Sequence, residues 1–253
     1  MIAINRKYLF LYCNIANFFK NAYMIRGAGS VMVTIVFVGL ISFSAVFGQE
    51  SAGKVLNPGI DIYSSYIWRG SKYGTGPAIQ PVIEFTAGSF TAGAWGSFDF
   101  RGYQETDLYF VFSLPAGFSL GMTDYYSPDL RYFDYSEKSG SHAYEINVNF
   151  SRGNFSLGSN YILNKAGGIG SSGGDKYFEA SYSLKSIILF IGAGDGWHTK
   201  ESDTGRKRFA VCNIGLGTTK QIKITESFSL PVNAQLVLNP DSEQLFIVAG
   251  FSF

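Results

Sequence analysis

The sequence is poor in the residue types that supply cross-links, metal ligands and strong surface charge. It has two cysteines and two histidines among 253 residues, and charged residues make up only 15% of it. The histidines and cysteines show no spacing typical of a metal site, so we predict neither a metal nor another cofactor. A formal net charge of +1 lacks the strongly basic character of nucleic-acid binders, so no nucleic acid is expected as a partner.

Acidic residues are missing from the N-terminal segment. Residues 1–48 hold four bases and no acid, which leaves 16 of the 20 bases and all 19 acids to the remainder, with a net charge of −3. Arg26 precedes the apolar run VMVTIVFVGLISFSAVFG, which ends in small residues. This layout predicts a signal peptide over residues 1–48, with cleavage after Gly48 and with Met24 as an alternative start. A single transmembrane anchor over Val31–Phe47 is the alternative, because the run is close to the ~18 residues that span a bilayer.

Removal of this segment would also remove Cys13 and leave Cys212 alone in the mature chain. No intramolecular disulfide is then possible. An exported protein of this sequence must be stabilised by something other than disulfide bonds.

Aromatic residues and glycine are abundant, with 23 Phe, 16 Tyr and 30 Gly, and this composition favours extended, pleated structure. Beyond residue 57, apolar and polar residues alternate with period two. The stretch FTAGAWGSFDF, for example, places Phe98 and Phe100 on one face and Ser97 and Asp99 on the other. Such alternation predicts half-buried antiparallel strands, but it does not decide whether the apolar face meets a core or lipid.

Twelve segments have this strand-like pattern. They are 59–69, 77–87, 89–100, 105–114, 117–126, 142–151, 154–163, 176–184, 187–196, 207–217, 228–239 and 244–253. Each is close to the roughly 9 to 11 residues that a tilted strand needs to cross a bilayer. Very short links (AGS, PAG, RGN, KS) alternate with long polar ones, which is the pattern of a transmembrane barrel with short turns on one rim and long loops on the other. The exceptions are a longer link on the short side, TTKQIKITES, and two tight links on the long side, RGYQE and NPDSE.

We therefore predict an all-β fold, a transmembrane antiparallel up-and-down β-barrel of twelve strands. It is expected over residues 58–253, after a short periplasmic segment at 49–57. A soluble β-sandwich or lipocalin-like barrel is the alternative, but twelve inward apolar rows would overfill a lumen of that size. Turned outward, the same rows match a lipid-facing band.

Three motifs in the first predicted strands resemble a known family. They are Tyr66, Arg69 and Gly70 in a Tyr-x-x-Arg-Gly motif; Pro77, Gln80 and Pro81 in Pro-x-x-Gln-Pro; and Gly93, Trp95, Gly96 and Ser97 in Gly-x-Trp-Gly-Ser. This pattern is similar to the start of the Gcw_chp (TorF-like) family of bacterial outer-membrane proteins. The resemblance covers the mature chain, with its specific part at residues 61–100. It implies a channel-type barrel in the bacterial outer membrane, without an established substrate.

The polar strand faces supply a set of candidate lumen-lining residues. They are Asp61, Tyr63, Arg69, Glu84, Trp95, Asp99, Asp107, Tyr109, Glu145 and Glu179. Acids in this position must meet water, a base or a proton. If they meet water, we expect a passive pore for small hydrophilic solutes, with a bias towards cations or neutral solutes. If they pair with Arg69, Arg101 and lumen tyrosines, the alternative is a closed structural or adhesive barrel.

Arg69 itself is expected near the outer mouth, either as a free cation on the wall or paired with a carboxylate such as Glu84 or Asp99. Aromatic residues near strand ends are predicted to sit at the two membrane interfaces. These are Tyr66, Trp68, Tyr125, Tyr126, Tyr161, Trp197, Phe228 and Phe253. Tyr63, Trp95 and Tyr109 are expected to point inward, where they could fill the lumen or form a stacking track for a sugar or nucleoside.

The sequence offers little to an enzyme. His142 follows Ser141, but both histidines, His142 and His198, lie at loop margins, and no His-x-Ser pair occurs within a strand. We predict that the chain is not an enzyme, with a lipid-modifying activity as the least favoured alternative.

The expected partners follow from the predicted location. Membrane lipids would contact the barrel wall. The basic cluster GRKR at 205–208 is expected to be a solvated loop charge, with contact to lipopolysaccharide as the alternative. The terminal strand LFIVAGFSF ends in Phe253, which resembles the closing aromatic by which outer-membrane assembly machinery recognises its substrates.

Overall fold

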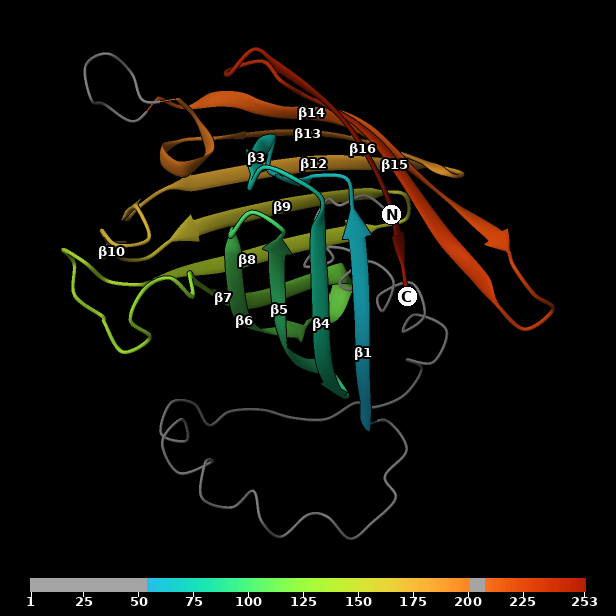
Figure 1. The fold of residues 1–253 in the computed structure, drawn as a ribbon, viewed down its shortest axis with the longest axis horizontal. Helices are drawn as coiled ribbons and strands as arrows, with labels where there is room; N and C mark the ends of the chain where they lie inside the picture. The colour runs from blue at the N-terminus through green and yellow to red at the C-terminus, as the bar shows by residue number, and fades with distance from the viewer. Residues whose placement is uncertain (1–53, 201–207) are drawn as a thin grey trace, which may run out of the picture.

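The computed structural model describes residues 54–200 and 208–253 of the chain. Within these residues, twelve long strands form one closed antiparallel barrel in the order β1-β16-β15-β14-β13-β12-β9-β8-β7-β6-β5-β4, so the predicted fold class is confirmed (Figure 1). The predicted signal peptide over 1–48 lies outside the described residues. None of the described helices is long and apolar enough to span a membrane.

The barrel strands follow one another along the chain as antiparallel neighbours. They are β1 (Lys54–Tyr63), β4 (Ala78–Ala87), β5 (Phe90–Asp99), β6 (Gln104–Ser113), β7 (Phe118–Tyr126), β8 (His142–Arg152), β9 (Phe155–Ile162), β12 (Lys176–Leu184), β13 (Ile187–Gly194), β14 (Ala210–Lys223), β15 (Ser229–Asn239) and β16 (Gln244–Ser252). Two small hairpins, β2–β3 (Tyr66–Trp68 and Ser71–Tyr73) and β10–β11 (Lys165–Ala166 and Ser171–Ser172), lie outside this order.

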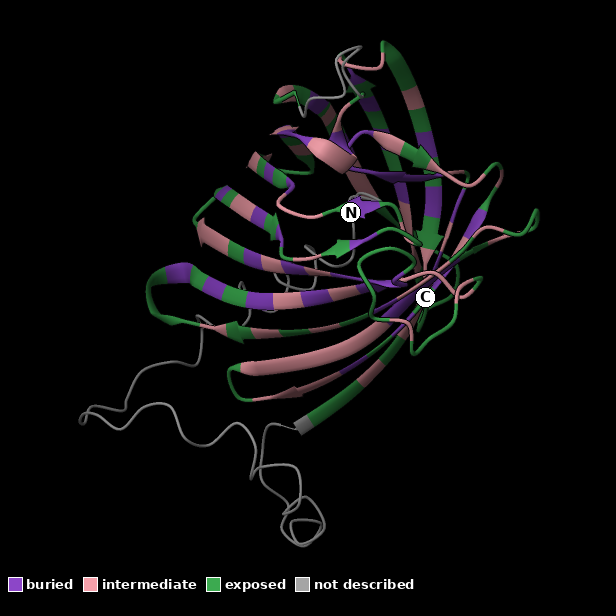
Figure 2. Cartoon of the chain, turned by 90° about the vertical axis from the view of Figure 1, so that its left-hand side faces the viewer, coloured by how far each residue is buried: buried purple, intermediate pink, exposed green. Residues whose placement is uncertain are grey.

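Alternation along the strands separates a polar interior from an apolar exterior. On β6, Asp107 is fully buried, whereas its neighbour Leu108 is 45% exposed. Figure 2 shows the same banding of buried and exposed residues on strand after strand. The exposed apolar side chains come from every part of the wall and include Phe110, Leu120, Leu157, Leu189, Leu216 and Ile247. The described barrel therefore has the reverse of the usual distribution of polarity in a water-soluble domain.

Short and long connections alternate, as the sequence predicted. Short turns at 88–89, 153–154 and 185–186 join strands at one rim, and both described ends of the barrel, Lys54 and Phe253, lie at that rim. The longer connections at the other rim, called here the outer rim, include residues 64–77, 127–141 and 163–175.

The prediction of a first strand over 59–69 is wrong at both ends. β1 begins earlier, at Lys54, and leaves the barrel wall after Tyr63. Residues 54–57, expected as part of a periplasmic segment, therefore belong to the barrel, and residues 49–53 lie outside the described part of the chain. Tyr66–Trp68, expected as the end of this strand, forms the separate hairpin strand β2. Period-two alternation continues across the break, which is why the sequence pattern did not locate it.

The tenth strand also differs from its prediction at 207–217. β14 runs from Ala210 to Lys223, so most of the link TTKQIKITES is strand. It pairs with β15 down to Lys223↔Ser229, and it carries a bulge opposite Gly192 and Ala193. Residues 211 and 214 are exposed, whereas Cys212 and Asn213 are both buried. The extra residue at the bulge thus turns two consecutive side chains inward.

The barrel closes where β1 pairs with β16, through Asp61↔Ser252, Ile62↔Phe251 and Tyr63↔Gly250. Closure leaves no free edge at these residues. Gly250 makes the close approach possible, because a Cβ there would overlap the Tyr63 ring and the backbone carbonyl of Ile62.

Gly250→Ala is therefore expected to impair barrel closure, with an overpacking cost of about 1–3 kcal/mol. The measurement is the fraction of protein that shows the heat-modifiable mobility of a folded barrel in electrophoresis. Gly158→Ala on β9 is the matched control, because the nearest atom to its Cβ would be a side-chain oxygen of Asn149 at 3.1 Å. Equal folded fractions for the two variants would contradict the assigned role of Gly250.

Candidate functional site: the inward hairpin and the outer cavity

The β2–β3 hairpin folds into the barrel and reaches the opposite wall. Trp68 and Ser71 pair across a two-residue turn in which Arg69 has φ 50° and Gly70 has φ 83°. This is the type I′ geometry, in which both central residues have positive φ. A Cβ on Gly70 would overlap the Cys212 carbonyl of β14, and Asn239 of β15 donates to the Gly70 carbonyl at 3.1 Å. The tip of the hairpin is thus fixed against β14 and β15.

Arg69 is an unusual choice for the first turn position, where glycine, Asn or Asp avoids the strain. Its side chain points into the barrel, where the side chains of Arg69 and Glu145 are 2% and 1% exposed. Nη1 donates to one oxygen of Glu145 at 2.6 Å and Nη2 donates to the other at 2.8 Å. Such a bidentate pair fixes both charges in the interior. The expected partners of Arg69, Glu84 and Asp99, are not the residues that hold this bidentate contact.

Further donors converge on the same carboxylate. Tyr125 donates its hydroxyl to Glu145 at 2.9 Å, and Asn147 donates to it at 2.6 Å. Asn147 also bonds to Asn160 of β9 and accepts from Thr123 of β7. Glu145 therefore ties the hairpin to three adjacent strands of the wall, because β7, β8 and β9 each contribute to its network.

The guanidinium of Arg69 lies between two aromatic rings. Its Cζ is 4.5 Å from the centre of the Trp68 ring and 4.4 Å from that of Tyr177, both suitable for cation–π attraction. Nη1 lies 3.3 Å from Nε2 of the buried His198, which accepts from it. Burial and, secondarily, the Arg69 charge hold the pKa of His198 well below its usual 6.5. The ring is therefore neutral and serves as an acceptor.

Most of the remaining predicted lumen residues also have interior partners. Tyr109 donates to Glu84 at 2.6 Å, and Tyr177 donates to Glu179 at 2.6 Å with further help from Asn213. Four others lie buried against the interior, namely Asp61, Tyr63, Trp95 and Asp107. Asp99, at the end of β5, instead lies at the outer rim. Its carboxylate accepts from the backbone N–H groups of residues 75, 101 and 103, and so organises that rim.

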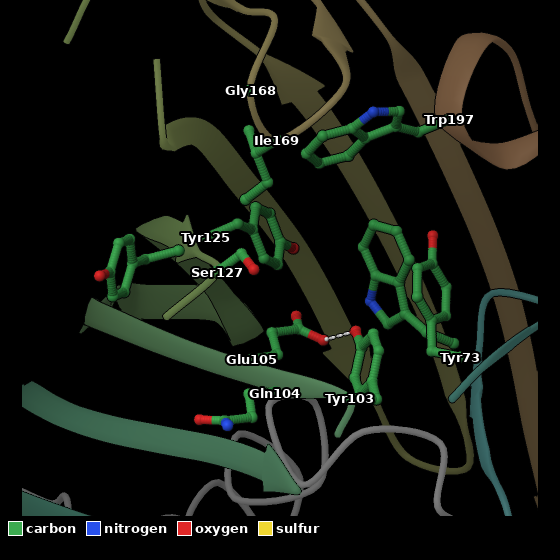
Figure 3. Close-up of a pocket in the computed structure, with 11 residues that line it drawn as sticks. Tyr73, Tyr103, Gln104, Glu105, Tyr125, Ser127, Gly168, Ile169 and Trp197 are labelled. Carbon is green, nitrogen blue, oxygen red and sulfur yellow. Dashed lines mark hydrogen bonds between the residues drawn. The ribbon is translucent and has the colours of Figure 1, made fainter. Parts of the chain in front are cut away.

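Above the Arg69–Glu145 pair, aromatic residues enclose a cavity of about 230 Å³ that faces the outer rim. Its aromatic walls come from Trp68, Tyr73, Tyr103, Tyr125 and Trp197, as Figure 3 shows for the labelled members. Tyr103 donates to the lining carboxylate of Glu105 at 2.8 Å. The lining residues belong to the β2–β3 hairpin, the β5–β6 and β7–β8 regions, and two further long connections. Five segments far apart in the sequence thus meet at one site.

Sequence reasoning placed Tyr66, Trp68 and Tyr125 at the membrane interfaces, and this is wrong. They are 2%, 5% and 3% exposed and form one buried cluster with Trp95. The missed signal is the turn itself. A two-residue turn ending in glycine, flanked by aromatic residues at 66, 68 and 73, is typical of a small hairpin rather than of a continuing strand.

His142 does not pair with the neighbouring Ser141 as a catalytic base pairs with a nucleophile. The Ser141 hydroxyl donates to the carbonyl oxygens of Arg131 and Asp134 instead. His142 places Nδ1 3.0 Å from Asp124 and faces the Tyr132 carbonyl with Nε2. This arrangement anchors the connection at 127–141 to the rim. Among the described side chains, no group of His, Cys, Asp and Glu is arranged to hold a metal ion.

Comparison with known proteins adds no identity. No protein-family model matches the chain, and no curated protein matches it in sequence. The resemblance to the Gcw_chp (TorF-like) family therefore stays a prediction, and the function has to be argued from the geometry.

Breaking the buried Arg69–Glu145 pair is expected to destabilise the folded protein strongly. Arg69→Met leaves Glu145 uncompensated, so the free energy of unfolding is expected to fall by about 3–5 kcal/mol. The double variant Arg69→Met/Glu145→Leu should lose less than the two single variants combined, because no lone charge remains. Denaturant unfolding, followed by tryptophan fluorescence, measures both.

Lys223→Met is the control for this series, because it breaks the exposed pair Lys223–Glu226, whose side chains are 59% and 95% exposed. A change below about 1 kcal/mol is expected there. A similarly small change for Arg69→Met would show that the interior pair does not hold the hairpin.

His198 predicts a pH dependence of stability. Its folded pKa lies below the unfolded value near 6.5, so the unfolded chain binds the proton first as the pH falls. Stability from this group is complete above about pH 6.5 and decreases below it, by up to about 1.4 kcal/mol per pH unit. Unfolding midpoints at pH 8 and pH 5 should therefore differ more in the wild type than in His198→Gln. The same difference in both proteins would rule out this contribution.

Proposed function

We propose that the chain is an outer-membrane β-barrel that is closed at rest by its β2–β3 hairpin. One observation carries this proposal, namely the buried bidentate pair between Arg69 on the hairpin tip and Glu145 on the wall. It supports the closed alternative over the open passive pore that the sequence favoured.

The membrane part of the proposal is supported by the reversed polarity of the wall. Outward apolar residues such as Phe112, Leu184 and Ile191 are 42–48% exposed, and they recur on strand after strand. An apolar surface that surrounds a barrel far exceeds what soluble monomers present to water. In lipid the same side chains are favourably placed, and every barrel strand pairs with two neighbours, as a bilayer requires.

Closure is supported by the hydrogen bonds that acidic side chains of the wall already make inside the barrel. An open aqueous pore needs polar side chains that line a continuous wet path. Here the wall acids Glu84, Glu145 and Glu179 accept hydrogen bonds from tyrosine hydroxyls. The hairpin, meanwhile, spans the interior from β1 to β14. Water and ions would have to displace the hairpin to cross.

Its partners would then be lipids around the wall, lipopolysaccharide at the outer rim, and the assembly machinery that reads the terminal strand with Phe253. Most of the basic GRKR stretch lies outside the described residues. Its last member, Arg208, forms an ion pair with Asp241, so that charge contributes to the rim itself.

Electrical recording in planar bilayers tests the proposal. Wild-type protein is expected to give no steady conductance. Because Tyr63 and Ala78 pair directly, residues 64–77 can be replaced by an Asn-Gly turn without altering the β1–β4 ladder. That variant is expected to conduct, with preference for cations, because the acidic wall remains.

A matched control replaces residues 127–141 by the same turn between Tyr126 and His142, which also pair directly. It should stay closed. Steady conductance of the wild type would overturn the proposal, and so would a folded hairpin-replacement variant that does not conduct.

A further inference from the structure

The outer cavity carries an inference that goes beyond closure of the barrel. At about 230 Å³ it holds roughly eight waters at about 30 Å³ each. It is smaller than the ~300–1,000 Å³ typical of sites for drug-sized ligands. Its occupant is therefore limited to about one small ring.

Ring orientations decide what shape of ligand fits. Trp197 meets Trp68 at 72° and Tyr125 at 75°, and Trp68 meets Tyr73 at 73°. These walls form the sides of a box, whereas a flat base or aromatic ligand is best held in a slot between parallel ring faces. A puckered, saturated ring can place an apolar C–H face on one wall and present its edges to the others.

The charged groups around the cavity disfavour both anionic and cationic ligands. The described lining residues include the Glu105 carboxylate and no Lys, Arg or His, which disfavours an anion. A cation is disfavoured because the Arg69 guanidinium already lies over the Trp68 ring, 4.5 Å from its centre. A neutral ligand avoids both repulsions.

The charged group that the cavity wall offers to a ligand is the Glu105 carboxylate. Trp68 is 5% exposed, and its Nε1–H has no hydrogen-bond partner among the described residues. That nitrogen has almost no accessible surface, so a ligand in the cavity meets the ring of Trp68 and not its N–H. Glu105, in contrast, offers oxygens that accept hydrogen bonds. The ligand therefore needs a hydroxyl donor on the edge of its ring.

We propose that this cavity binds a single neutral saccharide ring, a pyranose presented from the outer side of the barrel. One C–H face of the sugar packs on an aromatic wall such as Trp68, and one ring hydroxyl donates to Glu105. The site is built from the hairpin and the outer connections, so binding does not depend on whether the barrel conducts.

The test uses full-length mature protein in a polyoxyethylene detergent, which carries neither a sugar nor an ammonium head group. Quenching or enhancement of tryptophan fluorescence, with calorimetry as a second readout, is measured against methyl glucoside, methyl galactoside and N-acetylglucosamine. Adenosine and tetramethylammonium serve as the flat and cationic comparison probes. Saturable binding of at least one glycoside, with no binding of either comparison probe, is expected.

Variants locate the site. Glu105→Ala removes the acceptor, so Kd should rise roughly tenfold or more, as one hydrogen bond to a charged group predicts. Glu105→Gln retains an acceptor and should change Kd by less than about threefold. Trp95→Phe, which alters a tryptophan that does not line the cavity, is the control and should bind as the wild type does.

Three outcomes would overturn the assignment. One is that no glycoside binds when it is present in at least 50-fold excess over the protein, up to its solubility limit. Another is tighter binding of adenosine or tetramethylammonium than of any glycoside. The third is unchanged glycoside affinity in a Glu105→Ala protein whose folded state is verified by its heat-modifiable mobility.

Discussion

The position of one guanidinium determines the arrangement of the interior. Arg69 stands at a turn position where a non-glycine residue is strained, and the bidentate bond to Glu145 offsets that cost. Because the charge is buried, it cannot leave this carboxylate without a large loss of stability. The hairpin must therefore lie inside the barrel. Its position in turn brings Trp68 and Tyr73 under the outer connections, and so creates the cavity.

The barrel wall could be predicted from the sequence because a strand needs only local information. Period-two alternation and the spacing of turn residues define each strand, and neighbouring strands then pair in order. The interior could not be predicted in the same way. Which carboxylate receives Arg69 depends on where a hairpin 76 residues earlier in the chain comes to rest. Glu84 and Asp99 are closer in sequence, but neither stands on the part of the wall that the turn faces.

The same limit explains the aromatic residues. Local reasoning placed Tyr66, Trp68 and Tyr125 at the membrane interfaces, because they are aromatic and stand near predicted strand ends. The burial of these residues in one cluster results from the departure of β1 from the wall after Tyr63. The period-two alternation of the sequence does not mark that point. The occupied interior and the outer cavity are thus properties of tertiary structure, whereas the apolar exterior follows from the alternation within each strand.

The central claim, that the hairpin occupies the lumen, is tested most directly by the native thiol of Cys212. It is fully buried, beside the backbone that Gly70 approaches. In folded protein, a membrane-impermeant maleimide is expected to leave this thiol unlabelled for hours, although denaturant exposes it at once. In the variant with residues 64–77 replaced by a short turn, it should be labelled within minutes. Rapid labelling of Cys212 in the folded wild type would contradict the account.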